Sequence, residues 1–268
     1  MNVTLFGPLQ VTDGNRTLRG ADFGGQKPRG LLELLLLARG RTVSKEQLAD
    51  QLWGDAPPRN VAGTLEHYVC VLRRRLSDDQ QLARRILVTE SGAYRFSLDQ
   101  VDVDLDRFDR LVLQAEYADD ATCRRLLGEA VAMVGGDLLD DAPYAPWAAA
   151  ERDLYRSRVA RAHLWLGRDA VLTGAHSSAV RHGEAALRFA PYSEEAFRII
   201  MIADHALGHA DLARLTHLRC RQTLSECLSV DPTTETENVA SAIDGGMPAT
   251  DLIEAFARRT LGAMLAAA

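Results

Sequence analysis

Hydrophobic and polar residues alternate along the start of the chain, in the stretch VTLFGPLQVTDGNRTLRG, and this alternation predicts two or three short strands. Asp13-Gly14 supplies a hairpin turn between them. From Lys27 the period becomes helical and stays so until Gly40; the apolar positions are Leu31, Leu34, Leu35 and Ala38. The chain is therefore expected to begin with a small antiparallel sheet followed by a helix.

Two further helices and a hairpin fill the rest of the first hundred residues. Ser44 and Gln47 have the spacing of a capping box, which indicates the start of a second helix. Asn60 can cap a third helix that runs to about Leu76. The stretch ILVTESGAYRFSL then has the pattern of two strands joined by a turn. A sheet, three helices and a hairpin in this order predict a winged helix-turn-helix over residues 1–99.

The pattern from residue 100 onward is helical, and no strand-like alternation returns. We expect helices near residues 105–117, 121–134, 146–172, 176–189, 193–207, 210–228 and 248–265. Gly174 and Gly208 lie 34 residues apart, the tetratricopeptide period, and an alanine follows each glycine five residues later. A non-repeating helical bundle is the alternative, because only about two such units are visible. The predicted fold is thus an α+β winged helix-turn-helix followed, over residues 100–268, by an all-α tetratricopeptide-like domain with a C-terminal helical tail.

Composition agrees with two globular domains, since 47% of the 268 residues are hydrophobic and 25% are charged. The longest apolar run, LLELLLL, is far shorter than the roughly 20 residues of a membrane-spanning helix, and the N-terminus lacks the pattern of a secretion signal. We therefore expect a cytoplasmic protein that makes no membrane contact. No nucleophile-elbow, metalloprotease, phosphate-loop or dinucleotide motif occurs, so the sequence does not indicate an enzyme.

Possible metal ligands occur in three places, and none has the spacing of a metal site. The four cysteines are scattered. Gly208 interrupts the helix between His205 and His209, and the aspartates near residue 102 lack the glycine and the closing glutamate of a calcium loop. We expect no metal and no cofactor.

Charge is distributed unevenly along the chain. Residues 1–99 carry 14 Lys and Arg against 11 Asp and Glu, a net charge of +3. The remaining residues carry 17 against 26, a net charge of −9. The basic excess therefore lies in the predicted winged helix, where it favours an anionic partner.

The third predicted helix has an apolar and a polar face. At helical spacing, its core stripe consists of Leu65, Val69, Leu72 and Leu76. The opposite face consists of Gly63, His67, Cys70 and Arg74, with Val71 beside it and Arg73 and Arg75 on the two flanks. A helix in a major groove has base edges beneath it and phosphates on both sides, so we expect Arg74 to face the bases.

Glu66 and Arg95 each allow more than one interpretation of their role at a DNA surface. Glu66 would be repelled by phosphate unless it accepts a hydrogen bond from a cytosine amino group or pairs with an arginine. Arg95, on the second strand of the hairpin, is as consistent with a plain surface residue as with a DNA contact. Small residues, Gly63 and Thr64, allow the start of the third helix to approach the groove closely.

Several stretches resemble the SARP-type transcription activators, in the family's order and over nearly the whole chain. They are LFGPLQV, GGQKPRGLLELLLLARGRTVSKEQLADQLWGDAPP, TLEHYVCVLRRRL and VDVDLDRFDRL. The resemblance implies an OmpR-type winged helix joined to a bacterial transcriptional activation domain. It also implies an activator of antibiotic or other secondary-metabolite genes, which binds direct repeats in double-stranded DNA near promoters and engages the sigma or alpha subunit of RNA polymerase.

The resemblance and the helix geometry together give the expected DNA-contacting residues. They are Arg59, Gly63, Thr64, His67, Val71, Arg73, Arg74, Arg75, Tyr94 and Arg95. A single winged helix offers a small interface, so a homodimer on tandem sites, associated with the nucleoid, is the expected assembly. Two departures from the family pattern are Cys70-Val71, where Ser-Arg is usual, and Ala93-Tyr94, where Gly-Tyr is usual. Two alternatives remain: a ligand-sensing regulator, and a helical-repeat adaptor whose winged helix has lost DNA binding.

Overall fold

The computed structural model describes residues 1–99 and 101–266, and it divides into two compact units. Unit 1 comprises residues 1–113 and 132–155. Unit 2 comprises residues 114–131 and the chain from residue 156 onward. The compact unit that holds the winged helix thus extends past residue 99, the domain limit that the sequence suggests, to residue 113, and it also includes residues 132–155.

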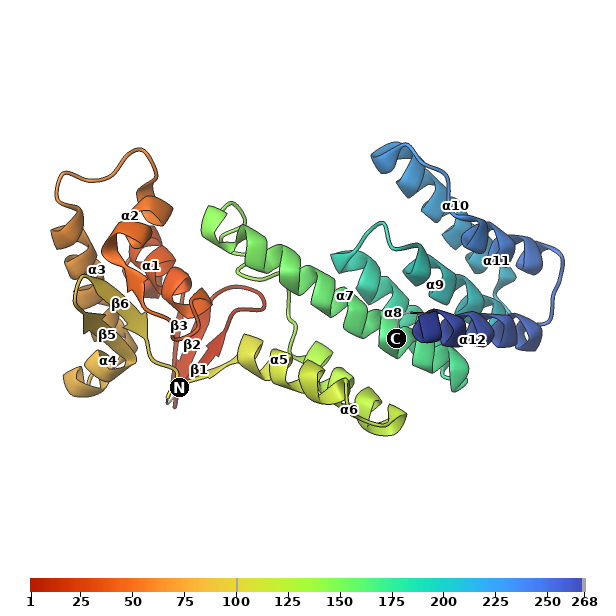
Figure 1. Ribbon diagram of the computed structural model, residues 1–268, viewed down its shortest axis with the longest axis horizontal. Helices are drawn as coiled ribbons and strands as arrows, with labels where there is room; N and C mark the ends of the chain where they lie inside the picture. The colour runs from red at the N-terminus through yellow and green to blue at the C-terminus, as the bar shows by residue number, and fades with distance from the viewer. Residues whose placement is uncertain (100, 267–268) are drawn as a thin grey trace. The chain divides into compact units, whose positions relative to one another are not determined.

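Unit 1 contains two small sheets (Figure 1). The first has the order β3-β2-β1-β7; its strands are β1 (Asn2–Thr4), β2 (Gln10–Asp13), β3 (Arg16–Arg19) and β7 (Asp102–Val103). β2 and β3 form the predicted antiparallel hairpin around Gly14, whose φ of +55° suits the turn, and β7 adds a parallel strand beside β1. The second sheet has the order β4-β6-β5, from β4 (Val43–Ser44), β5 (Leu87–Glu90) and β6 (Ala93–Phe96), and contains the predicted second hairpin.

The winged helix of unit 1 contains the three predicted helices and one that the sequence pattern did not reveal. They are α1 (Gln26–Leu37), α2 (Lys45–Trp53), α3 (Val61–Leu76) and α4 (Gln80–Ile86), preceded by the short helix η1 (Gly20–Phe23). The Ser44 side chain accepts a hydrogen bond from the Gln47 backbone N–H at 3.1 Å, which confirms the capping box. The missed helix α4 is only seven residues long and is capped by Asp79, whose carboxylate accepts from two backbone N–H groups.

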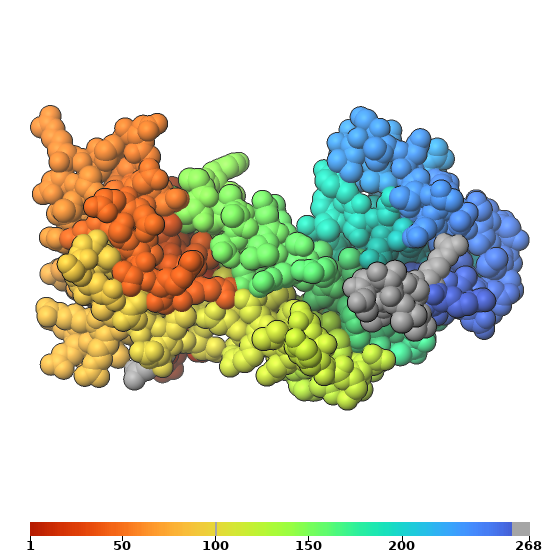
Figure 2. Space-filling model, in the orientation of Figure 1, coloured from red at the N-terminus to blue at the C-terminus, as the bar shows by residue number. Residues whose placement is uncertain are grey.

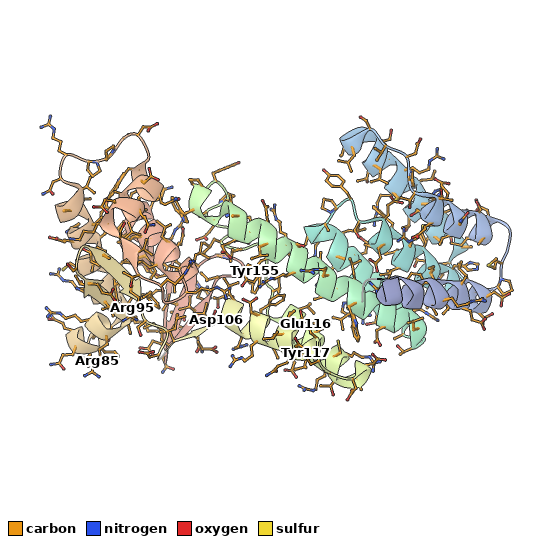
Figure 3. All side chains as sticks on the ribbon, viewed as in Figure 1. Arg85, Arg95, Asp106, Glu116, Tyr117 and Tyr155 are labelled. Carbon is orange, nitrogen blue, oxygen red and sulfur yellow. The ribbon has the colours of Figure 1, made fainter. Side chains whose placement is uncertain are left out.

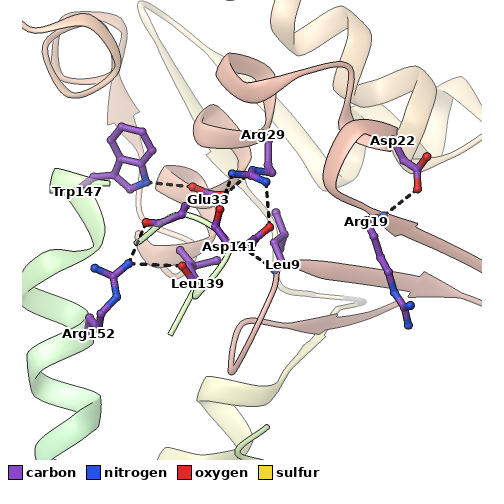
Figure 4. Close-up of polar contacts among 10 residues, drawn as sticks. Leu9, Arg19, Asp22, Arg29, Glu33, Leu139, Asp141, Trp147 and Arg152 are labelled. Carbon is purple, nitrogen blue, oxygen red and sulfur yellow. Dashed lines mark hydrogen bonds and ion pairs between the residues drawn. The ribbon is translucent and has the colours of Figure 1, made fainter. Parts of the chain in front are cut away.

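A polar cluster in unit 1 attaches the segment after residue 132 to α1 (Figure 4). Glu33 is fully buried in α1, where it pairs with Arg29 at 3.1 Å and accepts from the indole Nε1 of Trp147 at 3.2 Å. Burial raises the pKa of the Glu33 carboxyl, and the Arg29 charge opposes this rise. Arg29 also donates to Asp141 Oδ2 at 2.9 Å. The two charges thus pair with each other within α1, and each also has a hydrogen-bond partner more than a hundred residues away.

The predicted helical domain is confirmed by helices that continue through unit 2 to the last described residues, although the short strand β7 falls within the region that was expected to be all-α. The seven that were predicted are α5 (Asp104–Ala115), α6 (Asp120–Ala132), α7 (Ala149–Leu172, after η2 at Pro146–Ala148), α8 (His176–Phe189), α9 (Glu194–Ala206), α10 (Ala210–Leu228) and α12 (Ala249–Ala266). The sequence pattern missed α11 (Thr234–Asp244), which packs on α9 and α10. Over the described ranges, 1–99 and 101–266, no helix is long and apolar enough to cross a membrane.

The 34-residue spacing of unit 2 corresponds to a repeated helix-turn-helix. Gly174 and Gly208 lie in the loops before α8 and α10 with φ of +77° and +83°, values that favour glycine. The alanines five residues later, Ala179 and Ala213, are both completely buried. A Cβ on Gly183 would lie 2.5 Å from Cγ1 of Ile200, so the glycine permits α8 and α9 to pack closely. The tetratricopeptide-like fold is thus confirmed.

Candidate nucleic-acid interface

Helix α3 is held in unit 1 by the apolar stripe that the sequence predicts. Leu65, Val69, Leu72 and Leu76 are each at most 2% exposed, and the helix packs on α1, α2 and α4. The Asn60 Oδ1 accepts from the Gly63 backbone N–H at 2.9 Å, which confirms the predicted cap. The buried stripe therefore fixes the orientation of α3 about its own axis, and this orientation decides which residues form the opposite face.

The face of α3 opposite the core is open to solvent at three of its four predicted positions. His67, Cys70 and Arg74 are exposed, and Gly63 is half-buried. Arg75, on one flank, is also exposed. A substituent at Gly63 would meet the Asn60 side chain, so this glycine leaves space for the cap.

The remaining predicted residues at the start of α3 differ in accessibility. Arg59 is exposed in the turn that precedes the helix. Thr64 is half-buried, and its hydroxyl donates to the backbone oxygen of Asn60 at 2.7 Å. Arg59 is thus an accessible cation, whereas Thr64 contributes to the start of the helix.

Arg73 does not extend outward as a flanking cation. Its Nε and Nη2 donate to the backbone oxygen of Leu87 at 3.0 and 2.6 Å, and Nη2 also donates to Thr89 Oγ1 at 2.8 Å. Burial lowers the pKa of the Arg73 guanidinium, and the nearby charge of Arg84 lowers it further. The side chain therefore connects α3 to β5, the first strand of the β5-β6 hairpin that forms the wing, a role that helical spacing alone did not indicate.

Tyr94 is also placed differently from the expectation of a DNA-contacting wing residue. It is 1% exposed, and the Lys45 ammonium lies 5.5 Å from the centre of its ring. Burial raises the pKa of the Tyr94 hydroxyl. The Tyr94 ring is therefore part of the core beneath the second sheet. The charged group next to it is the Lys45 ammonium.

Glu66 pairs with Lys45, and not with an arginine. The two side chains are 2.9 Å apart, and this hydrogen bond raises the pKa of Lys45. Glu66 is 62% exposed, so the pair lies at the surface of the helix. One cation close to the open face of α3 is thus neutralised within the protein.

Val71 is half-buried beside the open face, and it packs against η1. A Cβ built on Gly24 would overlap Cγ1 of Val71, and Gly24 has a φ of +89°. The valine methyl therefore occupies space that Gly24 leaves open. This contact differs from the expectation of a groove-facing Val71.

The wing carries one of the predicted cations in an ion pair. Arg95 Nε lies 3.0 Å from Glu90 Oε1, and the arginine side chain is 31% exposed. Hydrogen bonds from Thr42 and Arg95 lower the pKa of Glu90. Figure 3 labels Arg95 on β6 and Arg85 on α4, two elements of the same unit.

A groove of about 640 Å³ lies between α3, α4 and the wing. Its lining includes Cys70, Arg73, Arg74, Arg84 and Thr89. Arg84 and Arg85 of α4 are exposed cations that the sequence reasoning did not select, because α4 was not recognised. In the space-filling view, α3 and α4 contribute to one face of unit 1 (Figure 2). Nowhere in the described part of the chain do three His, Cys, Asp or Glu side chains gather as a metal site.

Comparison with family models identifies both parts of the chain. Residues 24–96 match the family described as "Transcriptional regulatory protein, C terminal". Residues 103–244, more than half of the chain, match "Bacterial transcriptional activator domain". The chain belongs to the SARP family of transcription regulators. This family consists of regulators and not enzymes. Within this SARP protein, the activator-domain match begins in unit 1, so part of that domain folds with the winged helix.

Relatives of known name are regulators of different lengths. The SARP chain is 29% identical over 242 residues to the regulatory protein AfsR of Streptomyces griseus, covering 88% of this chain and 24% of AfsR. It is 27% identical over 259 residues to the transcriptional regulatory protein MoaR1 of Mycobacterium tuberculosis, covering 93% of this chain and 81% of MoaR1. The chain thus spans about a quarter of AfsR and most of MoaR1.

A solved structure supports the fold over nearly the whole chain. The structure of Mycobacterium tuberculosis EmbR in complex with a low affinity phosphopeptide superposes with a TM-score of 0.77 at 24% identity. The superposition covers 98% of this chain and 70% of that one. The likeness supports the fold of the SARP chain and nothing further.

Proposed function

We propose that this SARP protein is a sequence-specific DNA-binding transcription activator, with α3 in the major groove of duplex DNA. The observation that supports this most directly is the open row of His67, Cys70 and Arg74 on the face of α3 opposite its buried stripe. An arginine on such a face can donate two hydrogen bonds to a guanine edge. Arg74 is therefore the base-reading residue of the proposal.

Phosphate contacts are assigned to the exposed cations around this row. Arg75 flanks it on α3, Arg59 precedes the helix, and Arg84 and Arg85 lie on α4. Arg95 contributes from the wing if its ion pair with Glu90 opens. Such contacts position a protein on DNA without reading its sequence, and they make the affinity depend on salt.

The helical domain is assigned to protein partners. The SARP resemblance implies contact with RNA polymerase, through its sigma or alpha subunit, and control of antibiotic or other secondary-metabolite genes. A homodimer on direct repeats would join two small interfaces and thereby raise the affinity. AfsR and MoaR1 are both named as regulatory proteins, which supports the general role.

An electrophoretic shift assay on promoter fragments from the host's gene clusters tests DNA binding. We expect a specific complex whose affinity falls as salt rises from about 50 to about 200 mM. Arg74→Ala should weaken it by about 1–3 kcal/mol. Arg125→Ala is the matched control, because Arg125 is an exposed arginine of α6, outside the winged helix.

The assay also separates the proposal from its rival. Absence of any complex at low salt would mean that the winged helix has lost DNA binding and that the chain acts as an adaptor. An equal loss in the Arg74→Ala and Arg125→Ala variants would remove Arg74 from its assigned role.

A further inference from the structure

A pocket of about 360 Å³ lies within unit 2, among α7, α9, α11 and α12. Helix α12, which supplies part of the lining, contacts α9. The volume lies in the range of small-molecule sites, roughly 300–1,000 Å³. None of its lining residues belongs to the DNA interface described above.

One part of the pocket lining is apolar. Val239 of α11 and Leu252 of α12 are 7% and 4% exposed, and Phe256 lies one helical turn beyond Leu252. A ring, an isopropyl group and an isobutyl group provide a surface for a hydrocarbon body. Burial of such a body removes apolar surface from water, which favours binding.

The other part of the lining carries two arginines from adjacent helices, Arg168 of α7 and Arg198 of α9. Arg168 Nη2 lies 2.5 Å from Glu195 Oε1. Its Nε is buried and has no hydrogen-bond acceptor among the residues described. A buried donor without an acceptor is costly, and an oxygen of a ligand would satisfy it.

Arg198 is held less firmly by its acidic neighbour. Its Nη2 lies 3.3 Å from Glu235 Oε2, and the Glu235 side chain is 61% exposed. Its Nη1 donates to Thr236 Oγ1 at 3.0 Å, which fixes the guanidinium without neutralising it. An exposed carboxylate at this distance is a weak partner that a ligand carboxylate can replace.

We propose that this pocket binds a small amphiphilic carboxylate. The hydrocarbon body lies against Val239, Leu252 and Phe256, and the carboxylate accepts hydrogen bonds from Arg168 and Arg198. The proposal goes beyond DNA binding and does not depend on it, because every residue that it uses lies in unit 2.

Isothermal titration of the full chain with sodium octanoate tests the proposal, with octylamine and 1-octanol as probes of equal chain length. We expect saturable octanoate binding, at least tenfold weaker octanol binding and no octylamine binding, because a charged acceptor is required by the arginines. Octanoate should also raise the melting temperature of the chain.

Two variants test where octanoate binds. Arg168→Gln should weaken octanoate about 10- to 100-fold, since hydrogen bonds to charged groups are among the stronger ones. Arg214→Gln is its control, because Arg214 also forms an ion pair between helices of unit 2, with Asp244, and does not line the pocket. Ala255→Leu fills the pocket while leaving both arginines intact, and should abolish binding. Ala257→Leu, on the same helix and outside the lining, should not.

Equal affinity for octanoate and octanol would overturn the proposal, and so would full binding by a folded Ala255→Leu variant. Absence of octanoate binding at about 1 mM, a weak-affinity limit, would overturn it as well. If Arg168→Gln unfolds the chain, Ala255→Leu still decides the outcome. The titration contains no DNA. A negative titration therefore counts against the carboxylate pocket alone, and a negative shift assay counts against DNA binding alone.

Discussion

Arg73 Nη2 donates to the backbone oxygen of Leu87 at 2.6 Å and thereby joins helix α3 to the first strand of the wing. Two further hydrogen bonds from the same guanidinium, one to Leu87 and one to Thr89, complete the link. Arg73→Ala removes all three, so we expect the free energy of unfolding to fall by about 1–3 kcal/mol. Urea denaturation followed by circular dichroism measures the change.

Arg74, the next residue, supplies the matched control for this prediction. Its side chain is exposed and points away from the core, so Arg74→Ala should change the free energy of unfolding by less than about 0.5 kcal/mol. The same substitution should weaken DNA binding, as proposed above. Equal destabilisation by the two variants would show that Arg73 is not the structural residue of the pair.

The ion pair between Lys45 and Glu66 removes one positive charge from the proposed DNA face. Glu66→Gln keeps the size of the side chain and frees Lys45 to contact phosphate, so DNA affinity should rise. The slope of log affinity against log salt should steepen by about one unit, the value for one additional phosphate contact. Shift assays at several salt concentrations measure this slope.

A control distinguishes this release of Lys45 from a general change in net charge. Glu129→Gln removes an equally exposed carboxylate from a helical ion pair with Arg125, outside the winged helix. It should leave the salt slope unchanged. A slope that steepens equally in both variants would attribute the effect to total charge and not to Lys45.

Gly24, which follows η1, and Val71 of α3 occupy complementary space. Gly24→Ala puts a Cβ into the Val71 methyl group and into a backbone with φ of +89°, so we expect a loss of about 1–3 kcal/mol of stability. Val71→Ala should restore part of this loss in the double variant, because it removes the overlap but not the backbone strain. Thermal denaturation of the unchanged protein, the two single variants and the double variant measures the coupling between the two residues. Additive losses would show that the two residues do not interact.

Local sequence signals predicted much of this architecture. The caps at Ser44 and Asn60 and the positive-φ glycines at 174 and 208 depend on neighbours a few residues away, so the sequence pattern was sufficient to identify them. The sequence pattern did not predict α11, because the polar residues at its start, TTETEN, resemble a loop. Its buried residues do have helical spacing; they are Thr236, Val239, Ala240 and Ile243. A search for that spacing would have found the helix.

The side-chain roles were harder to predict, because they depend on contacts between distant elements. Helical spacing placed Arg73 on a flank of α3, but gave no indication that the wing would bring the Leu87 carbonyl within reach. Glu33 interrupts an apolar run, and its partner Trp147 lies 114 residues away. The sequence pattern therefore identified which face of α3 is open, while the structure distinguishes the residues available on it from those used internally.

His163 of α7 and His182 of α8 face each other within unit 2, with Nδ1 atoms 3.1 Å apart. Burial, together with the smaller effects of His182 and Arg188, lowers the pKa of His163 from 6.5 to about 4. Burial also lowers the pKa of His182, with a further contribution from Arg181. Both rings are therefore neutral in the folded protein at pH 7, and one Nδ1–H can donate to the other Nδ1.

Acid should destabilise the protein through this pair. As the pH falls from 6.5 towards 4, the unfolded chain takes up protons that the folded chain does not, so the free energy of unfolding decreases. The pKa shift of His163 corresponds to a loss of about 3 kcal/mol at pH 4. His163→Phe should flatten the stability profile between these pH values, as measured by urea denaturation, whereas the exposed His67→Phe should not. An unchanged slope in a folded His163→Phe variant would exclude this histidine as a source of the acid sensitivity.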